Sequence, residues 1–325
     1  MERKEWIDIT KGIGIIAVVA GHIYVGNIKL IIFMFHMPLF FFLSGYLFNP
    51  KHDKKKYFKK KVIHLLVPYV MFLLLIYYGF FFIINKEHID ILGLLIKPII
   101  GGRFLINETG VFWFVPVLFI TQQLMNFLFV KTSLKYTLII VILFLSFSYV
   151  NSLFLPKIWF PLNLNVVFAS IPIFYIGYYV KKLNIKDNYI LLFVGLIVIF
   201  ITVFLIPQNT YDMKYSNYGL PIITLFSGVL LTLNIKQIAI FLSKIKLINH
   251  FLSKLGNASM VIMFLHLPCK ILIERYISTN YTVQFFLATT ISYVLYIILK
   301  KNIYLRAFFL GSNYDIEAIK SRYKK

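Results

Sequence analysis

The chain is built from apolar stretches of about twenty residues that alternate with short polar segments. A helix of about twenty residues crosses the roughly 30 Å of hydrocarbon in a lipid bilayer. The composition agrees, because 60% of the residues are hydrophobic and 14% are charged, whereas about a quarter are charged in an ordinary globular domain. We therefore predict an all-α protein, a polytopic transmembrane helical bundle of about ten helices.

The predicted helices follow one another without an internal repeat or a low-complexity linker. They cover residues 6–25, 30–49, 62–84, 111–130, 134–150, 165–180, 189–206, 218–234, 257–273 and 283–299. This pattern predicts one membrane-embedded domain over residues 1–299 and a short basic cytoplasmic tail at 300–325. The tail is too short and too charged to form a core of its own, so we expect it to lie along the inner surface of the membrane.

The basic residues lie in short blocks between the predicted helices. Segments on one side carry about 25 lysines and arginines, and segments on the other side carry about 7. The excess of positive charge marks the cytoplasmic loops of membrane proteins, so both termini are predicted to be cytoplasmic. The net charge of +22 therefore reflects topology and contact with membrane lipids, and it does not indicate a nucleic-acid partner.

The first predicted hairpin, WIDITKGIGIIAVVAGHIYVGNIKLIIFMFHMPLFFFLSGYLF, carries ionisable residues inside apolar sequence. Each costs about 2.5 to 3.5 kcal/mol at the middle of a membrane helix, so each needs a partner, a wet cavity or a task. Lys11 and His22 lie within about 20° of each other around a helix, and Asp8 lies within about 60° of both. The helical rise places Lys11 roughly 16 Å and Asp8 roughly 21 Å from His22. We predict that Asp8 pairs with Lys11 near the cytoplasmic surface, while His22 lies in the outer half of the bilayer.

Two further histidines, His36 and His266, each precede a proline by two positions. Proline removes a backbone donor and can kink a helix, which opens polar backbone groups toward a cavity. His22 and His36 are expected to differ in depth by about 5 Å, and His266 lies about seven residues before the outer end of its own helix. The three histidines are therefore expected to share one layer of the membrane.

Each of these residues also has a simpler structural explanation. A histidine in a membrane helix is often hydrogen-bonded to a neighbouring helix, which applies to His36 and His266. The charged pair of the first helix fits snorkelling at a helix start. The lysines between residues 51 and 61 determine topology and bind any anionic lipid surface, and Trp113 stands where aromatic belts occur at a membrane boundary.

Particular motifs are similar to those of a known family. The first hairpin carries Trp6, Asp8, Lys11, Gly12, Val18, Val19, Gly21 and His22, followed by FHMPLFFFLSGYLF at 35–48. The further motifs are KYFKKKVIHLLVPY at 56–69, FWFVPVLF at 112–119, IPIFYIGYYVKK at 171–182 and LGNASMVIMFLHLP at 255–268. In this order, and over essentially the whole chain, the sequence resembles the acyltransferase-3 family, and within it the branch described as fucose 4-O-acetylase-like.

The resemblance implies a membrane transferase that moves an acyl group, usually acetyl from acetyl-CoA, to a hydroxyl of a cell-surface glycan or its lipid-linked precursor. The family's Arg-x10-His pattern falls on Lys11 and His22, so lysine stands where many relatives have arginine. The family's cytoplasmic Arg-x-x-Arg pattern falls on Lys61 and His64, without either arginine. Lysine is a point charge where arginine offers a bidentate fork, whereas His22 matches the pattern unchanged.

These residues lead to a hypothesis for the reaction. The predicted donor-binding residues, which share a place on the cytoplasmic side, are Lys11, Lys59, Lys60, Lys61 and His64. Acyl transfer to an alcohol needs a base near the hydroxyl, and imidazole suits that task near neutral pH. His22 either takes the hydroxyl proton or carries the acyl group as a covalent intermediate, and the sequence leaves both forms open.

The acceptor is expected to meet a second set of residues. His36, a second catalytic candidate, and His266 would orient the acceptor or stabilise the developing oxyanion, and Trp113 and Glu108 would form an outer platform for the sugar. The expected partners are acyl-CoA as donor substrate, a cell-surface glycan or lipid-linked sugar, and membrane lipids. No permanently bound cofactor and no metal is expected, and the single cysteine, Cys269, excludes an intramolecular disulfide and a cysteine-based zinc site.

Two other classes of protein fit a bundle of about ten helices. A glycan exporter or secondary transporter also carries buried charges and kinked helices, although its sites gather in two broken helices at matched positions. A non-catalytic partner of a glycan synthase is the third class. Residue usage rich in Lys, Ile, Asn and Phe is typical of an AT-rich bacterial genome, so the expected location is the bacterial cytoplasmic membrane. No pattern encodes the glycan, the hydroxyl, the acyl group or the oligomeric state.

Overall fold

The computed structural model describes residues 5–84, 91–185 and 188–322. The structure is 81% helical, and no strand occurs among the described residues, which confirms the predicted all-α fold. The helices, with short 3₁₀ or π turns labelled η, are α1 (Glu5–Ile23), α2 (Gly26–Tyr46), α3 (Lys54–Lys61), η1 (Val62–Leu66), α4 (Val67–Ile84), α5 (Ile91–Ile100), η2 (Gly102–Phe104), η3 (Asn107–Thr109), α6 (Phe114–Lys131), α7 (Leu134–Phe154), η4 (Pro161–Asn163), α8 (Val166–Lys182), α9 (Ile190–Phe204), η5 (Met213–Tyr215), α10 (Ile223–Leu242), α11 (Lys246–Tyr276), α12 (Tyr281–Lys301), α13 (Ile303–Phe309) and α14 (Asn313–Arg322).

Nine helical segments in the described part of the chain are long and apolar enough to cross a membrane. A further helix, α9, is apolar but has only 15 residues, which corresponds to a length of about 22 Å. With α9 included, each of the predicted ranges contains a helix. The protein is therefore a multi-pass membrane protein, and the predicted polytopic bundle is confirmed.

Counting η1 with α4, two helices, α10 and α11, differ from their predicted bounds by more than four residues at one or both ends. The helix predicted at 218–234 is α10, which begins later, at Ile223, because Gly219 adopts a φ of +61° in the preceding turn. The helix predicted at 257–273 is α11, which begins earlier, at Lys246. Its first turns are polar and were therefore expected to be a loop, but a helix satisfies its backbone hydrogen bonds internally and can continue beyond its apolar part.

The chain divides into two compact units by its internal contacts. Unit 1 comprises Met1–Pro50, Lys131–Trp159 and Asn165–Ser259, and unit 2 comprises Lys51–Val130, Phe160–Leu164 and Met260–Lys325.

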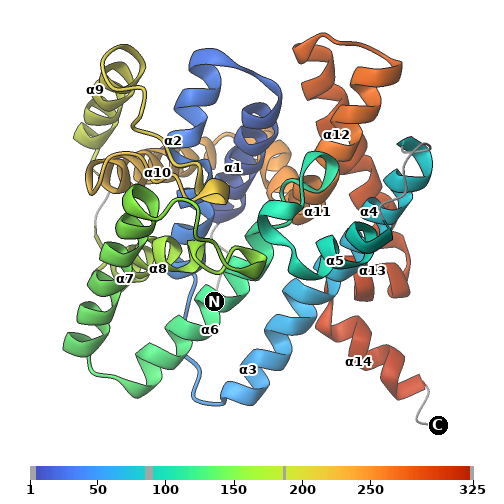
Figure 1. Cartoon of the computed structure of the whole chain (residues 1–325), viewed down its shortest axis with the longest axis horizontal. Helices are drawn as coiled ribbons and strands as arrows, with labels where there is room; N and C mark the ends of the chain where they lie inside the picture. Colours follow the sequence, from blue (N-terminus) through green and yellow to red (C-terminus); the bar gives the residue numbers. More distant parts are fainter. Residues whose placement is uncertain (1–4, 85–90, 186–187, 323–325) are drawn as a thin grey trace. The chain divides into compact units, whose positions relative to one another are not determined.

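In unit 1, α2 is the helix on which most others pack: α1, α8, α9 and α10 all contact it (Figure 1). Its crossing with α8 depends on two glycines. Gly45 lies against the backbone of Phe174, and Gly177 lies against the backbone of Phe42. A Cβ atom at either glycine would meet backbone atoms, so the two helices approach closely because both positions lack a side chain.

The first part of α11 crosses α1 in the same reciprocal manner. Gly12 of α1 lies against the backbone of Leu252, and Gly256 of α11 lies against the backbone of Asp8. The two glycines fix α1, the helix that carries the first set of candidate site residues, against a second helix of its own unit.

Unit 2 has an aromatic core. The ring of Phe264 lies 5.0 Å from that of Phe72 and 4.7 Å from that of Phe112, whose ring is in turn 5.7 Å from that of Tyr69. Phe309, in α13, lies 5.1 Å from Phe72. The residues of the predicted tail therefore form α13 and α14 and pack within this unit.

Candidate active site

The N-terminal part of α1 carries the predicted ion pair. Nζ of Lys11 donates to Oδ1 of Asp8 at 3.4 Å. The Asp8 side chain is 8% exposed and that of Lys11 is 32% exposed, so the carboxylate is held inside while the ammonium group reaches outward. The predicted pairing one helical turn apart is confirmed.

The face of α1 between Lys11 and His22 is buried. Ile15 is 1% exposed and Val18 is 4% exposed, so this stripe packs inside the protein. His22, at the far end of the stripe, is half-buried. The face that helical geometry assigned to Lys11 and His22 is therefore an interior face.

The Phe33 ring links the two histidines of the hairpin. The ring of His22 meets it edge-on at 6.5 Å between centroids, and the ring of His36 lies 4.6 Å from it. The ammonium group of Lys29 lies 5.2 Å from the same ring centroid, a distance at which a cation is attracted to the ring face. Both imidazoles of the hairpin thus lie beside one aromatic side chain.

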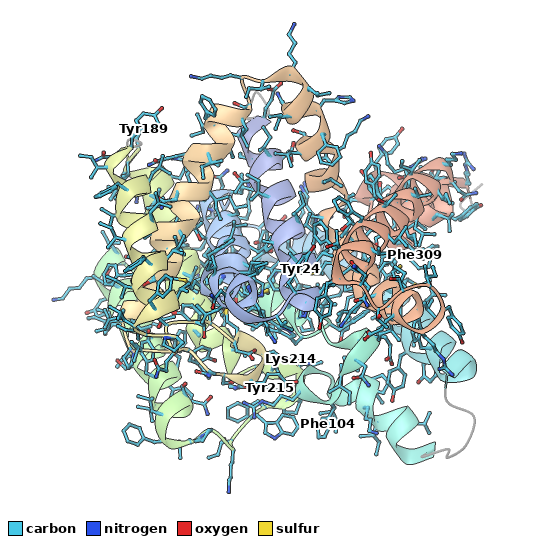
Figure 2. The ribbon with its side chains drawn as sticks, turned by 90° about the horizontal axis from the view of Figure 1, so that it is seen from above. Tyr24, Phe104, Tyr189, Lys214, Tyr215 and Phe309 are labelled. Carbon is cyan, nitrogen blue, oxygen red and sulfur yellow. The ribbon has the colours of Figure 1, made fainter. Side chains whose placement is uncertain are left out.

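The connection between α9 and α10 is anchored at the same residue. The backbone N–H of Tyr211 donates to the carbonyl oxygen of Phe33 at 2.8 Å. Tyr211 and Tyr218 are fully buried, whereas Lys214 and Tyr215 lie together on this connection (Figure 2), with the ammonium group 5.4 Å from the tyrosine ring.

His36 has a defined proton arrangement. Its Nδ1 lies 2.9 Å from the carbonyl oxygen of Ile32, and because a carbonyl oxygen only accepts, Nδ1 carries the proton. Pro38 has no N–H, so the carbonyl of Met34 lacks its usual helical donor. Gly228 of α10 packs there, and a Cβ at that position would be 2.9 Å from the Met34 oxygen. Since Nδ1 of His36 holds this proton, Nε2 is an acceptor in the neutral form of the ring.

His266 repeats this arrangement in unit 2. Its Nδ1 donates to the carbonyl oxygen of Ile262 at 2.9 Å, and the side chain is fully buried. Pro268 follows two positions later inside α11. Because His266 belongs to unit 2 and the other two histidines belong to unit 1, their shared layer stays a prediction.

The lysine block forms a helix that is fastened to α6 of the same unit. The side chain of Asn126 accepts from the backbone N–H of Lys51 at 2.7 Å and donates to the carbonyl oxygen of Lys51 at 3.1 Å. The ammonium group of Lys54 lies 4.5 Å from the Phe127 ring centroid, and the ring of Phe58 lies 5.5 Å from that of Phe119. These contacts fix the position of α3 on α6.

These attachments leave one basic face open. The exposed lysines of α3 are Lys55, Lys56, Lys59 and Lys60. They form two i,i+4 pairs and so share a face, which we call the lysine face. Lys61 is half-buried, with its ammonium group 5.6 Å from the Tyr57 ring centroid. His64 follows in the π turn η1 and is exposed. Of the predicted donor residues, Lys59, Lys60 and His64 are exposed, whereas Lys11 and Lys61 are half-buried.

The two predicted acceptor residues of unit 2 have different surroundings. Trp113 is 6% exposed, with its ring 6.1 Å from that of Phe114, so little of the indole is open to a sugar. Glu108 is half-exposed in η3. Among the described residues, no group of three His, Cys, Asp or Glu side chains could hold a metal ion.

A family model described as an acyltransferase domain matches residues 4–301. The chain belongs to the acyltransferase-3 family. It is therefore a membrane acyltransferase, and the resemblance drawn from its motifs is confirmed at the level of the family, while the fucose 4-O-acetylase-like branch stays a prediction. Comparison with curated proteins finds no match, and comparison with solved structures finds none either.

One buried residue of this acyltransferase escaped prediction because of a helix boundary. Lys236 lies beyond the helix predicted at 218–234 and was therefore expected outside the membrane helices. The helix continues to Leu242, and Lys236 is buried inside it with its ammonium group 5.7 Å from the Trp6 ring and 5.9 Å from the Tyr46 ring. The family motif residue Trp6 thus binds a lysine from α10.

Phe33 and Asn126 were also missed. Phe33 precedes His36 by three positions, a spacing that places two side chains on one helical face, so the sequence did contain a signal for it. Asn126 lies 75 residues from the lysine block that it holds, and no local pattern reveals such a contact.

Proposed function

We propose that this protein transfers an acyl group, most simply acetyl, from cytoplasmic acyl-CoA to a hydroxyl of a cell-surface polysaccharide or its lipid-linked precursor. The proposed location is the bacterial cytoplasmic membrane. The observation that carries the proposal is that a member of the acyltransferase-3 family has an imidazole at the family's histidine position, half-buried and edge-on to an aromatic ring.

His22 is the proposed catalytic base or acyl carrier. In the direct form it takes the proton of the acceptor hydroxyl while the oxygen attacks the thioester carbonyl. The carbon–sulfur bond breaks, the new ester bond stays on the glycan, and the proton passes to the CoA thiolate. In the two-step form, a ring nitrogen of His22 first accepts the acyl group and then releases it to the hydroxyl. Half-burial supports both forms, because the ring is shielded from bulk water and can still be reached.

His36 is proposed to orient the acceptor. An oxyanion needs a hydrogen-bond donor, and neutral His36 uses its N–H on the Ile32 carbonyl. Its Nε2 can instead accept a hydrogen bond from a sugar hydroxyl. Of the two roles predicted for this histidine, the hydrogen bond favours orientation of the acceptor.

The proposed donor site is the open face of α3 with the π turn that follows it. Ammonium groups neutralise phosphates as point charges, and Lys59 and Lys60 offer two that are exposed. Lys55 and Lys56 extend the same face by one turn. Membership of an acyltransferase family supports this reading over glycan export.

The test is transfer of radiolabelled acetyl from acetyl-CoA to surface glycan in membranes that carry His22→Ala. A general base contributes about 10²- to 10⁴-fold, so we expect the rate to fall at least about a hundredfold. His250→Ala is the matched control, because His250 is exposed near the start of α11 and its loss should leave the rate unchanged. Near-normal transfer by a correctly inserted His22→Ala protein would refute the catalytic role.

A further inference from the structure

The last residues of the chain pack against the helix that follows the lysine block. The family model ends at residue 301, and residues 302–322, which we call the C-terminal strap, form α13 and α14. α13 contacts α4, with Ala307 fully buried and the ring of Phe309 lying 5.1 Å from that of Phe72. A segment outside the matched domain is thus part of the packed core of unit 2.

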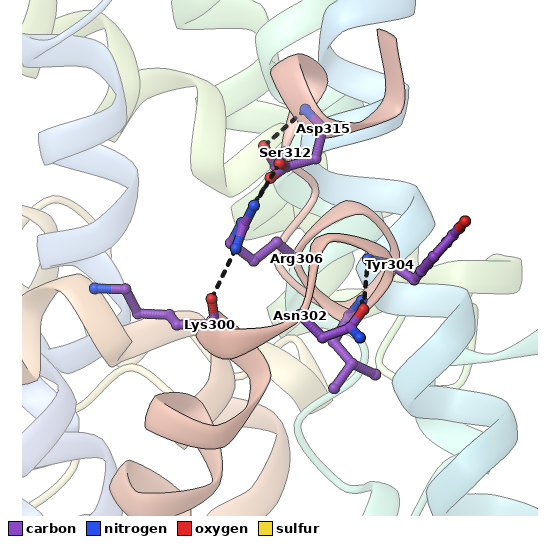
Figure 3. A network of polar contacts seen from close by, with 7 residues as sticks. Lys300, Asn302, Tyr304, Arg306, Ser312 and Asp315 are labelled. Carbon is purple, nitrogen blue, oxygen red and sulfur yellow. Dashed lines mark hydrogen bonds and ion pairs between the residues drawn. The ribbon is translucent and has the colours of Figure 1, made fainter. Parts of the chain in front are cut away.

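A bidentate ion pair between Arg306 and Asp315, which we call the arginine fork, joins α13 to α14 within the strap (Figure 3). Nε of Arg306 donates to Oδ2 of Asp315 at 2.9 Å, and Nη2 donates to Oδ1 at 2.8 Å. Nη1 also donates to the carbonyl oxygen of Lys300 at 2.9 Å. The hydrogen bonds from Arg306 lower the pKa of the buried Asp315 carboxyl group, so the pair is ionised at neutral pH. The fork therefore fixes the turn between α13 and α14.

Gly311, in that turn, lies against the backbone of the π turn η1. Its φ is +61°, in the left-handed region that residues with a Cβ adopt rarely. A Cβ built there would lie 2.7 Å from the carbonyl oxygens of both Ile63 and His64. Because both atoms are backbone, a larger residue must displace the strap or reshape the π turn.

The π turn connects the lysine face to α4, and His64 is its central residue. Its backbone is closed by the Val67 N–H, which donates to the Val62 carbonyl, and such turns often occur at functional sites. A π turn changes the angular register of the residues that follow it. Because His64 lies within the turn and Lys59 and Lys60 lie in the helix before it, the shape of the turn sets the position of His64 relative to these two lysines.

We propose that the C-terminal strap is a positioning element of the donor site, in which Gly311 holds the π turn in the shape that directs His64 toward the phosphate groups of acyl-CoA. The inference deepens the proposed function and rests on it, because both concern the same donor site. Lipid phosphates share this chemistry, so the experiment must separate the two sources of phosphate.

The experiment measures acetyl-CoA binding by the full-length protein in nanodiscs, by isothermal titration. The variants are Gly311→Ala and Gly311→Asn. Asparagine tolerates a positive φ better than alanine, but both carry a Cβ, so we expect both to raise the Kd about tenfold. Gly79→Ala in α4 is the control, since a Cβ at Gly79 meets nothing within 4 Å, and its Kd should equal that of the wild type.

Steady-state transfer separates positioning from folding. Both Gly311 variants should show the raised KM for acetyl-CoA with kcat retained at saturating donor, whereas general damage would lower kcat. Arg306→Gln, which opens the fork without adding a Cβ, should move KM in the same direction. A folded Gly311 variant, or Arg306→Gln if those variants fold poorly, with wild-type Kd and KM would overturn the inference.

Two further outcomes distinguish the proposals. If the wild-type protein does not bind acetyl-CoA, the proposed function fails, and this inference fails with it. If binding by the wild type is normal and the Gly311 effect appears only in nanodiscs of anionic lipid, not in zwitterionic ones, the strap acts on a lipid headgroup, and the donor-site inference is overturned. An equal effect in both lipids supports it.

Discussion

A proline two positions after a histidine accompanies the same local structure in both units. His36 and His266 each donate from Nδ1 to the carbonyl four residues earlier, at 2.9 Å. This bond fixes the neutral ring as one tautomer and leaves Nε2 as the acceptor. His22 lies instead near the end of α1 and is half-buried. The buried histidines are thus suited to accept hydrogen bonds from hydroxyls, and His22 is the one of the three that is partly open.

The effect of Lys214 on the stability of the folded protein depends on pH. Burial lowers its pKa from 10.5 to about 8, and attraction to Asp212 opposes this only in part. The folded state thus disfavours the charged amine, and the resulting destabilisation is fully present below pH about 8 and fades as the pH rises from 8 toward 10.5. We expect Lys214→Met to melt above the wild type at pH 7, with the difference shrinking by pH 10. A difference that stays constant across this range would contradict the lowered pKa.

At the scale of elements, the reciprocal glycines predict which helix pair is sensitive to a single methyl group. A Cβ at Gly45 or Gly177 would meet the backbone of the partner helix. Overpacking of this kind costs about 1 to 3 kcal/mol, so Gly45→Ala and Gly177→Ala should both lower the melting temperature. Gly79→Ala should not, because its Cβ has open space and alanine favours the helix over glycine by about 0.5 to 1 kcal/mol.

The double variant of Gly45→Ala and Gly177→Ala tests the same helix crossing more sharply. Both glycines lie where α2 crosses α8, so the first alanine moves the two helices apart and leaves more room for the second. The two destabilisations should therefore be less than additive. Strict additivity, or a melting temperature unchanged by either single substitution, would show that α2 and α8 do not approach as closely as the structure has them.

The membrane helices were predictable from sequence because length and hydropathy are local properties. The structure of the segments between the membrane helices was not predictable in this way. The lysines from 54 to 61 form a helix that begins after Asp53, whose side chain accepts from the backbone N–H of Lys56, and Asn126 of α6 binds the backbone of Lys51 just before it. The predicted tail packs on α4 through the contact of Phe309 with Phe72, and its place along the membrane surface stays a prediction. The contacts of Asn126 with Lys51 and of Phe309 with Phe72 join residues that are far apart in the chain, so no local pattern reveals them.

At the scale of the whole molecule, the candidate site residues fall into two sets. Asp8, Lys11 and His22 lie on one face of α1 in unit 1, as the helical repeat predicted. The lysine face with His64 lies in unit 2, and the sequence motifs identified its position in the chain but not the turn that presents it. Sequence periodicity therefore predicts which residues share a face of one helix. How the faces of different helices pack together depends on contacts that no single membrane span encodes.

The orientation of the molecule in the membrane is the last prediction. Basic residues on the predicted inner side outnumber those on the outer side by about 25 to 7, so Lys55 should face the cytoplasm and Lys29 the outside. The only cysteine, Cys269, is buried, so Cys269→Ser provides a background for single reporters. On intact cells a membrane-impermeant maleimide should label the Lys29→Cys variant and spare Lys55→Cys, and permeabilised cells should show both. The reverse pattern would place the lysine face, and with it the proposed donor site, on the side of the membrane that holds no acyl-CoA.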